Sequence, residues 1–149
     1  MLEPDEEEEV WRALNIAGGR FFRRECFHNA QSIINHGLLK TPLRYTEGYF
    51  WRPGVILPVH HAWVSINRKV VDLTARMDGN GQGLRGRFKN RIFGTLPEGW
   101  EYFGVDIPQE RVLEFFRSNV KNDTAYYASI IEDLFQGAPL LKGETCTST

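Results

Sequence analysis

The chain has 149 residues, of which 42% are hydrophobic, 25% charged and 13% aromatic. This length and composition are typical of one globular domain and argue against intrinsic disorder. A formal net charge of −1 gives no overall attraction to nucleic acid or to an anionic membrane, and no stretch approaches the ~18 apolar residues of a membrane span.

The N-terminal segment 1–9 is acidic and lacks the basic start and apolar core of a secretory signal peptide. We therefore expect a cytoplasmic protein whose two cysteines are thiols, although a disulfide between Cys26 and Cys146 stays open. The run from Glu6 to Leu14 predicts a short helix, because acidic side chains in a first turn favour the helix dipole.

A second helix is predicted from Cys26 to His36. Apolar or small residues recur at helical spacing on one face and lead to a glycine suited to a C-terminal cap: Ala30, Ile33, Ile34 and Gly37. Cys26 lies on the same face at the beginning of the helix. That position suits either a catalytic thiol or a buried, inert one.

Three strands are predicted next, over 43–51, 60–67 and 69–74. The last two are joined so tightly that they form an antiparallel hairpin. Alternation along 60–67 places His61, Trp63 and Ser65 on one face and His60 on the other. Only one of the two adjacent histidines can therefore face a thiol from the preceding helix.

A glycine-rich irregular loop is predicted from Asp78 to Asn90. Between residues 68 and 91 seven Lys or Arg stand against two Asp. Long irregular loops are uncommon without a function. The basic loop 76–91 is either a solvated loop or a substrate-gripping lid that binds an anion, for which Arg85, Arg87 and Lys89 are the candidate residues.

The remaining chain predicts a strand over 100–107, helices over 109–119 and 124–135, and a flexible tail over 138–149. The sequence contains no zinc-type Cys/His spacing and no dinucleotide-binding fingerprint, so neither a metal nor an organic cofactor is expected. The whole chain, 1–149, is predicted to form a single α+β domain.

Cys26, His61 and Asp72 follow one another in settings that suit thiol chemistry. A thiol attacks as thiolate, which a helix N-terminus and a neighbouring imidazolium both favour. A carboxylate on the other ring nitrogen fixes the tautomer and orientation of the imidazole. These residues are therefore the candidate nucleophile, general base and acid, and orienting group.

Three motifs follow the cysteine-led helix: Arg44-Tyr45-Thr46-Glu47-Gly48-Tyr49, His61-Ala62-Trp63 and Asp72-Leu73-Thr74. With them, the run 25–74 resembles the transglutaminase-like branch of the papain-like superfamily. The resemblance covers about a third of the chain, and it implies a cysteine-led helix packed on an antiparallel sheet. It implies a Cys26–His61–Asp72 triad, with His61 preferred to His60 because His61 heads its motif, and Trp63 as a substrate-binding residue.

The same resemblance implies acyl transfer from an amide or thioester: peptide or isopeptide hydrolysis, glutamine deamidation, or transfer to an amine. A protein or peptide substrate would be the partner, and whether it is anionic stays open. Asn15 and Asn29 are candidate oxyanion donors or structural residues. The alternative function is a non-catalytic intracellular binding protein or inhibitor on the same fold, which holds an anionic partner through the loop 76–91. The sequence does not indicate the oligomeric state.

Overall fold

The computed structural model describes residues 1–16, 24–36, 41–77, 88–121 and 128–132. Its elements in chain order are α1 (Pro4–Ile16), α2 (Cys26–His36), β1 (Arg44–Trp51), β2 (Val59–Ile66), β3 (Lys69–Asp72), β4 (Ile92–Phe93), β5 (Glu101–Ile107) and α3 (Gln109–Lys121). The strands form one five-stranded sheet of order β4-β3-β2-β1-β5, in which each neighbouring pair is antiparallel. The predicted α+β class is confirmed at this level.

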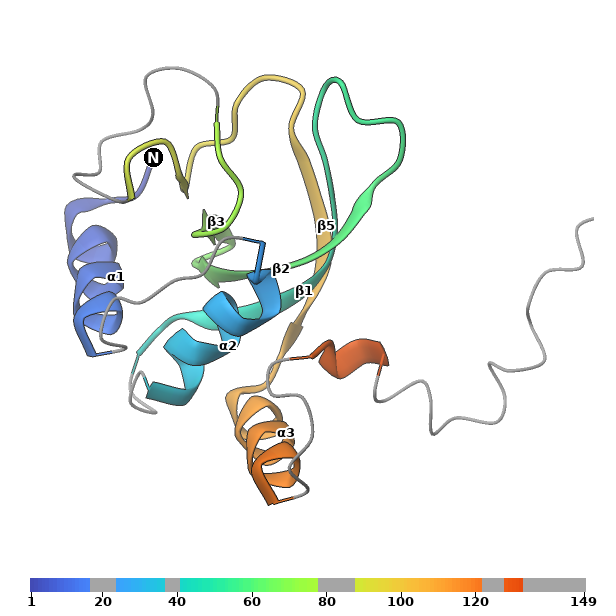
Figure 1. The fold of residues 1–149 in the computed structure, drawn as a ribbon. Coiled ribbons are helices and arrows are strands. Elements are labelled where there is room, and N and C mark those ends of the chain that lie inside the picture. Colours follow the sequence, from blue (N-terminus) through green and yellow to red (C-terminus); the bar gives the residue numbers. More distant parts are fainter. Residues whose placement is uncertain (17–23, 37–40, 78–87, 122–127, 133–149) are drawn as a thin grey trace, which may run out of the picture.

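Helix α2 lies across the sheet, and α1 and α3 contact α2 from two different sides (Figure 1). The predicted apolar face of α2 is buried: Ala30, Ile33 and Ile34 are at most 3% exposed. They join one hydrophobic cluster with Val64 of β2 and Val71 of β3. Burial of this face fixes the rotation of α2 on the sheet, because turning the helix would expose these side chains to water.

The predicted elements agree closely with α1, α2, β1, β2, β5 and α3. The third predicted strand, 69–74, ends earlier, because the backbone of Thr74 and Ala75 turns back to bond the Asp72 carboxylate. Strand β4 was not predicted, since two residues are too short to show an alternating pattern. Of the predicted helix 124–135, residues 130–132 are helical, and its remainder lies mostly outside the described residues, as do Gly37 and the tail 138–149. Within the described ranges, no helix is long and apolar enough to cross a membrane.

The connection between β2 and β3 is a two-residue turn. Asn67 and Arg68 both adopt left-handed backbone angles, with φ of 48° and 66°. This combination is typical of the type I′ turn, whose twist matches that of a hairpin. Asn tolerates the left-handed region, whereas Arg at the second position is strained.

Helix α1 is attached to this hairpin by Glu6. The Glu6 carboxylate accepts hydrogen bonds from Asn67 Nδ2 and Lys69 Nζ, each 2.8 Å long, and from the backbone N–H of Glu3. The bonds from Lys69, Asn67 and Glu3, in that order, lower the pKa of Glu6 to about 2. The hairpin is therefore held in place at its turn as well as along its strands.

Replacement of Arg68 with Gly should stabilise the protein, because glycine adopts φ near +60° without steric cost. We expect a gain of about 1 kcal/mol and a rise of about 2–4 °C in Tm by differential scanning calorimetry. Asn67→Gly is the matched control in the same turn. It should lower Tm, since it removes the hydrogen bond to Glu6. No gain in Arg68→Gly would show that the turn is not strained in solution.

Candidate active site

Cys26 is the first residue of α2. The helix begins here because the backbone N–H of Asn29 bonds to the carbonyl of Glu25 at 2.8 Å, and because Arg24 breaks the helical path with a φ of 66°. The Cys26 thiol is free and 9% exposed. The orphan N–H groups of a helix N-terminus lie around it, and they favour negative charge.

His61 and Asp72 come together through the register of the hairpin. Ser65 pairs with Val70 and Val64 with Val71, so the next step along the strands brings Asp72 level with Trp63. The side chains of Trp63 and His61 share one face of β2, and their rings stack with centroids 6.2 Å apart. His61 Nε2 lies 2.6 Å from Asp72 Oδ2, and both residues are buried.

The Asp72 carboxylate is completely surrounded by donors. Oδ2 accepts hydrogen bonds from His61 and from the Tyr102 hydroxyl at 2.8 Å. Oδ1 accepts from the backbone N–H groups of Thr74 at 2.9 Å and Ala75 at 3.0 Å. Burial alone would raise the pKa of Asp72, but the charge and hydrogen bond of His61 and these two N–H groups hold it below its usual value. Asp72 is therefore a carboxylate at neutral pH.

His61 is held as an imidazolium. Burial would lower its pKa, but the charge and hydrogen bond of Asp72, together with a hydrogen bond and charge from Cys26, raise the pKa to about 10. Because Nε2 bonds to Asp72, Nδ1 is the ring nitrogen left for the thiol. The three predicted catalytic residues are thus brought into one contiguous group.

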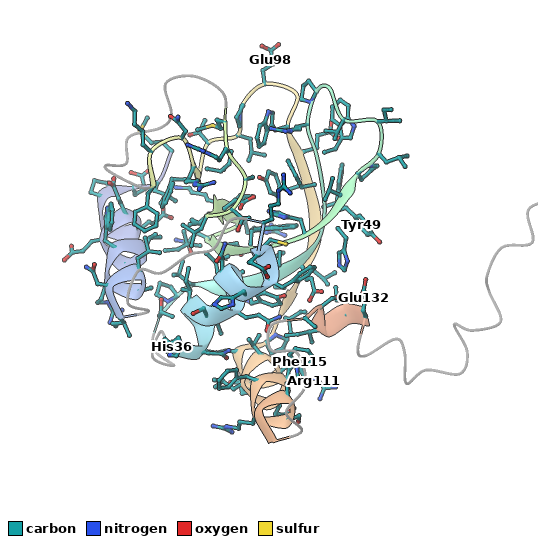
Figure 2. The ribbon with its side chains drawn as sticks, viewed as in Figure 1. His36, Tyr49, Glu98, Arg111, Phe115 and Glu132 are labelled. Carbon is teal, nitrogen blue, oxygen red and sulfur yellow. The ribbon has the colours of Figure 1, made fainter. Side chains whose placement is uncertain are left out.

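His60 lies on the opposite face of β2 and takes no part in this group. Its ring nitrogens lie 3.6 Å from Glu47 and 3.2 Å from Glu132, and its ring packs against Phe27 and Tyr49. Tyr49 and Glu132 lie near each other at the surface (Figure 2). The two neighbouring histidines therefore have separate surroundings, and it is His61 that contacts the carboxylate of Asp72.

Tyr102 was missed by sequence reasoning. It lies in the predicted strand 100–107, but only the pairing of Tyr102 with Phe50 brings its hydroxyl to Asp72. Burial raises the pKa of Tyr102 well above its ordinary value, and the charge and hydrogen bond of Asp72 raise it further. Tyr102 is therefore a neutral donor that orients Asp72.

Trp63 is 4% exposed, and its ring packs edge-on against Tyr102 with centroids 5.0 Å apart. A side chain at Gly104 would collide with it, since a Cβ there would lie 2.7 Å from Trp63 Cη2. Trp63 thus supports the ring of His61. Its expected contact with substrate stays a prediction.

The other predicted binding residues are only partly described. Arg85 and Arg87 lie outside the described residues, and Lys89 is exposed on the chain that leads to β4. The ends of the predicted basic loop, Arg76 and Arg91, both line a pocket beside His61. The substrate-binding role of Arg85, Arg87 and Lys89 stays a prediction.

The two candidate oxyanion donors differ in their surroundings. Asn15 is exposed on α1. Asn29 is buried, and its Nδ2 donates a 2.7 Å hydrogen bond to Thr74 Oγ1, which fastens α2 to the end of β3. Asn29 therefore helps to hold Cys26 and Asp72 at a fixed separation.

The pocket beside His61 has a volume of about 430 Å³. Its lining residues are apolar, small or basic, apart from His61 itself: Arg24, Phe50, Arg52, Val55, Val59, Leu73, Thr74, Ala75, Arg76 and Arg91. The walls come from the start of α2, the β1–β2 connection and the segments around β3 and β4. A substrate in this pocket would contact the imidazole side of the triad.

Within the described ranges, no group of three or more His, Cys, Asp or Glu side chains is arranged to hold a metal ion. Comparison of the chain with protein-family models, with curated proteins and with solved structures finds no match.

Replacement of Tyr102 with Phe should leave the fold intact but remove one of the donors to the buried Asp72 carboxylate. Hydrogen bonds to charged groups contribute about 1.5–3 kcal/mol, so we expect a loss of that order in the free energy of unfolding, measured with urea. Tyr49→Phe is the control, because Tyr49 is 53% exposed and should change stability by less than about 0.5 kcal/mol. Equal stability of the two variants would show that the Tyr102 hydroxyl does not act on Asp72.

Proposed function

We propose that this protein is a cysteine-dependent acyl-transfer enzyme with Cys26 as nucleophile, His61 as proton carrier and Asp72 as orienting carboxylate. The observation that carries the proposal is the buried His61–Asp72 pair, 2.6 Å apart, beside a thiol at a helix start. A buried ion pair is costly to desolvate and gives weak support to stability. Perturbed groups of this kind are concentrated at functional sites, which favours a catalytic role.

The arrangement places the Cys26 thiol in hydrogen-bond contact with the protonated His61 ring. In the first step, Cys26 Sγ attacks the acyl carbon, the bond to the leaving group breaks, and the leaving amine or thiolate takes a proton from His61. In the second step, water or an amine gives a proton to His61 and attacks the thioester, which releases the acyl product and restores the thiol pair. Asp72 remains charged throughout and keeps Nε2 protonated, so that Nδ1 exchanges the proton.

We infer that the core is of the papain-like or transglutaminase-like type that the sequence resembles. The support is the order of the parts: a cysteine-led helix, then a His-Ala-Trp strand, then an Asp-Leu-Thr segment that begins at the last residue of the next antiparallel strand. Hydrolysis, deamidation and transfer to an amine share the same thioester intermediate. An amine as the second substrate gives transfer, whereas water gives hydrolysis of a peptide or isopeptide bond or, from a glutamine side chain, deamidation.

An activated ester tests the proposal without knowledge of the natural substrate. Incubation with p-nitrophenyl acetate should release a burst of p-nitrophenolate equal to the protein present and leave an acetyl group on Cys26, detected by peptide mass spectrometry. Cys26→Ser should abolish the burst. His61→Gln should reduce its rate by about 100-fold or more, because general acid–base catalysis typically contributes 10²–10⁴-fold.

Acetylation that is equal at Cys26 and Cys146, or that is unaffected by His61→Gln, would contradict the proposal. The protein would then be a non-catalytic binding protein on this fold. Circular dichroism of each variant provides the control for folding, since His61 and Cys26 are both buried.

A further inference from the structure

The pocket beside His61 is unusually rich in arginine. Arg24 precedes α2, Arg52 follows β1, Arg76 follows β3 and Arg91 precedes β4. Among the described residues, no aspartate, glutamate or lysine lines the same pocket. Four segments that are distant in sequence therefore each bring one permanent positive charge to one pocket.

The charge of Asp72 favours the charged form of Arg91, but no carboxylate in the described parts of the chain forms an ion pair with any of the four arginines. The ion pairs there involve Arg12, Arg111, His60, His61 and Lys69, and none of the four pocket arginines. The nearest buried carboxylate, Asp72, has its oxygens occupied by His61, Tyr102 and two backbone N–H groups. The pocket therefore carries excess positive charge.

Two of the arginines are fixed in place by neutral groups. Arg91 Nη1 donates to the backbone carbonyls of Thr74 at 2.6 Å and Ala75 at 3.3 Å. Arg52 lies over the ring of Trp100 at 5.7 Å from its centroid and donates to the carbonyl of Arg76 at 3.4 Å. Carbonyls and an aromatic face orient a guanidinium but leave its charge available to a ligand.

The charges also repel one another. Burial lowers the pKa of Arg91 and the neighbouring charge of Arg76 lowers it further, while the charge of Asp72 opposes this in part. A protein keeps like charges together at a cost in stability, and a bound anion would offset that cost. Because guanidinium groups match the two oxygens of a carboxylate or phosphate, such a group is the ligand that the pocket fits best.

We propose that this pocket binds the anionic end of the acyl donor, a carboxylate or phosphate carried on a short apolar chain, and so makes the enzyme selective for negatively charged acyl donors. The apolar wall formed by Phe50, Val55, Val59 and Leu73 receives the chain, and a volume of about 430 Å³ is sufficient for a small acyl group. The identification of the ligand as an acyl donor rests on the proposed function. The binding of the anion does not depend on catalysis.

Two alkylating reagents of nearly equal size separate charge preference from thiol reactivity. Iodoacetate carries a carboxylate and iodoacetamide is neutral, and both attack the same thiolate. The ratio of their rates at Cys26 therefore cancels the thiolate population. We expect iodoacetate to react at least about tenfold faster than iodoacetamide at Cys26, in contrast to Cys146 or to the urea-unfolded protein.

The arginine variants locate the effect. Arg52→Gln and Arg76→Gln should each reduce the rate ratio about threefold to tenfold, and 0.5 M NaCl should reduce it as well, since salt screens exposed charge. Arg44→Gln is the matched control, because it removes the same charge from β1 outside this pocket. A ratio that is the same at Cys26 and Cys146, or that falls equally in Arg44→Gln, would overturn the inference.

A binding measurement covers the case in which neither reagent reaches Cys26. Succinate and inorganic phosphate should each raise the Tm of the wild-type protein, and neutral succinamide should not. The larger shift identifies whether a carboxylate or a phosphate is preferred. Loss of the Tm rise in Arg52→Gln supports anion binding in the pocket even if no acyl-enzyme ever forms. An acyl-enzyme that forms with no Tm rise and no charge preference overturns anion binding in the pocket and leaves the proposed function intact.

Discussion

Replacement of Asp72 with Asn should convert His61 from an imidazolium into a neutral imidazole at pH 7. In the wild-type protein the Asp72 charge and hydrogen bond oppose the effect of burial and raise the pKa of His61 to about 10. Asn supplies no charge, so burial should then dominate and bring the pKa below 6.5. The shift is readable from the pH dependence of the His61 ring signals in NMR.

The same substitution should lower acyl transfer by about 10³–10⁴-fold, because Asn offers its amide donor or its carbonyl to Nε2 and no longer fixes the charged form. Stability should also change in its pH dependence. The raised pKa of His61 contributes stability that is complete below pH 6.5 and is lost as pH rises towards 10. The lowered pKa of Asp72 contributes stability that is lost as pH falls below 3.8.

Asp72→Asn should therefore remove the decline in wild-type stability between about pH 7 and 10 that comes from this pair. Asp106→Asn is a control, because Asp106 is exposed and bonds to Thr46 away from His61. A wild-type His61 that titrates near 6.5, or an Asp72→Asn protein with unchanged His61 signals, would show that the two side chains do not form this pair in solution.

The sequence predicts much of this site because its chemistry lies in local patterns. Cys26 to His36 carries helical periodicity within eleven residues, and the hairpin around Asn67 and Arg68 is short enough for His61 and Asp72 to become neighbours. The pairing of β2 with β3 then follows from turn length. Local signals of this kind need no knowledge of the tertiary structure.

The features that sequence reasoning missed depend on long-range pairing. Tyr102 reaches Asp72 only because β5 pairs with β1 in a register that the sequence does not reveal, across thirty positions of chain. The four pocket arginines come from four separate connections, and their convergence depends on where each connection leaves the sheet. The excess of basic residues predicted an anion-binding role for the loop 76–91, whose two ends line the pocket. It gave no indication that Arg24 and Arg52 lie in the same pocket.

The reactivity of Cys26 across pH is the sharpest test of whether this geometry is catalytic. Cys26 lies at the start of α2 and its thiol is hydrogen-bonded to the His61 ring, and such surroundings favour a thiol that attacks readily. Brief treatment with iodoacetamide at pH 6, followed by peptide mass spectrometry, should therefore label Cys26. Cys146, set among threonine residues, has no histidine near it in the sequence and is expected to react far more slowly at that pH.

His61→Ala should reduce the labelling rate of Cys26 at pH 6 by about two orders of magnitude, because the imidazolium that favours attack by the thiol is removed. Cys146 should be unaffected by the substitution, and both cysteines should react alike in urea. Because Cys26 is 9% exposed, a failure to react in the folded protein at any pH would mean that the thiol is sealed in the core. Such a result, or a Cys26 curve that matches Cys146 with and without His61, would remove the nucleophile and leave the arginine pocket as the functional feature of this fold.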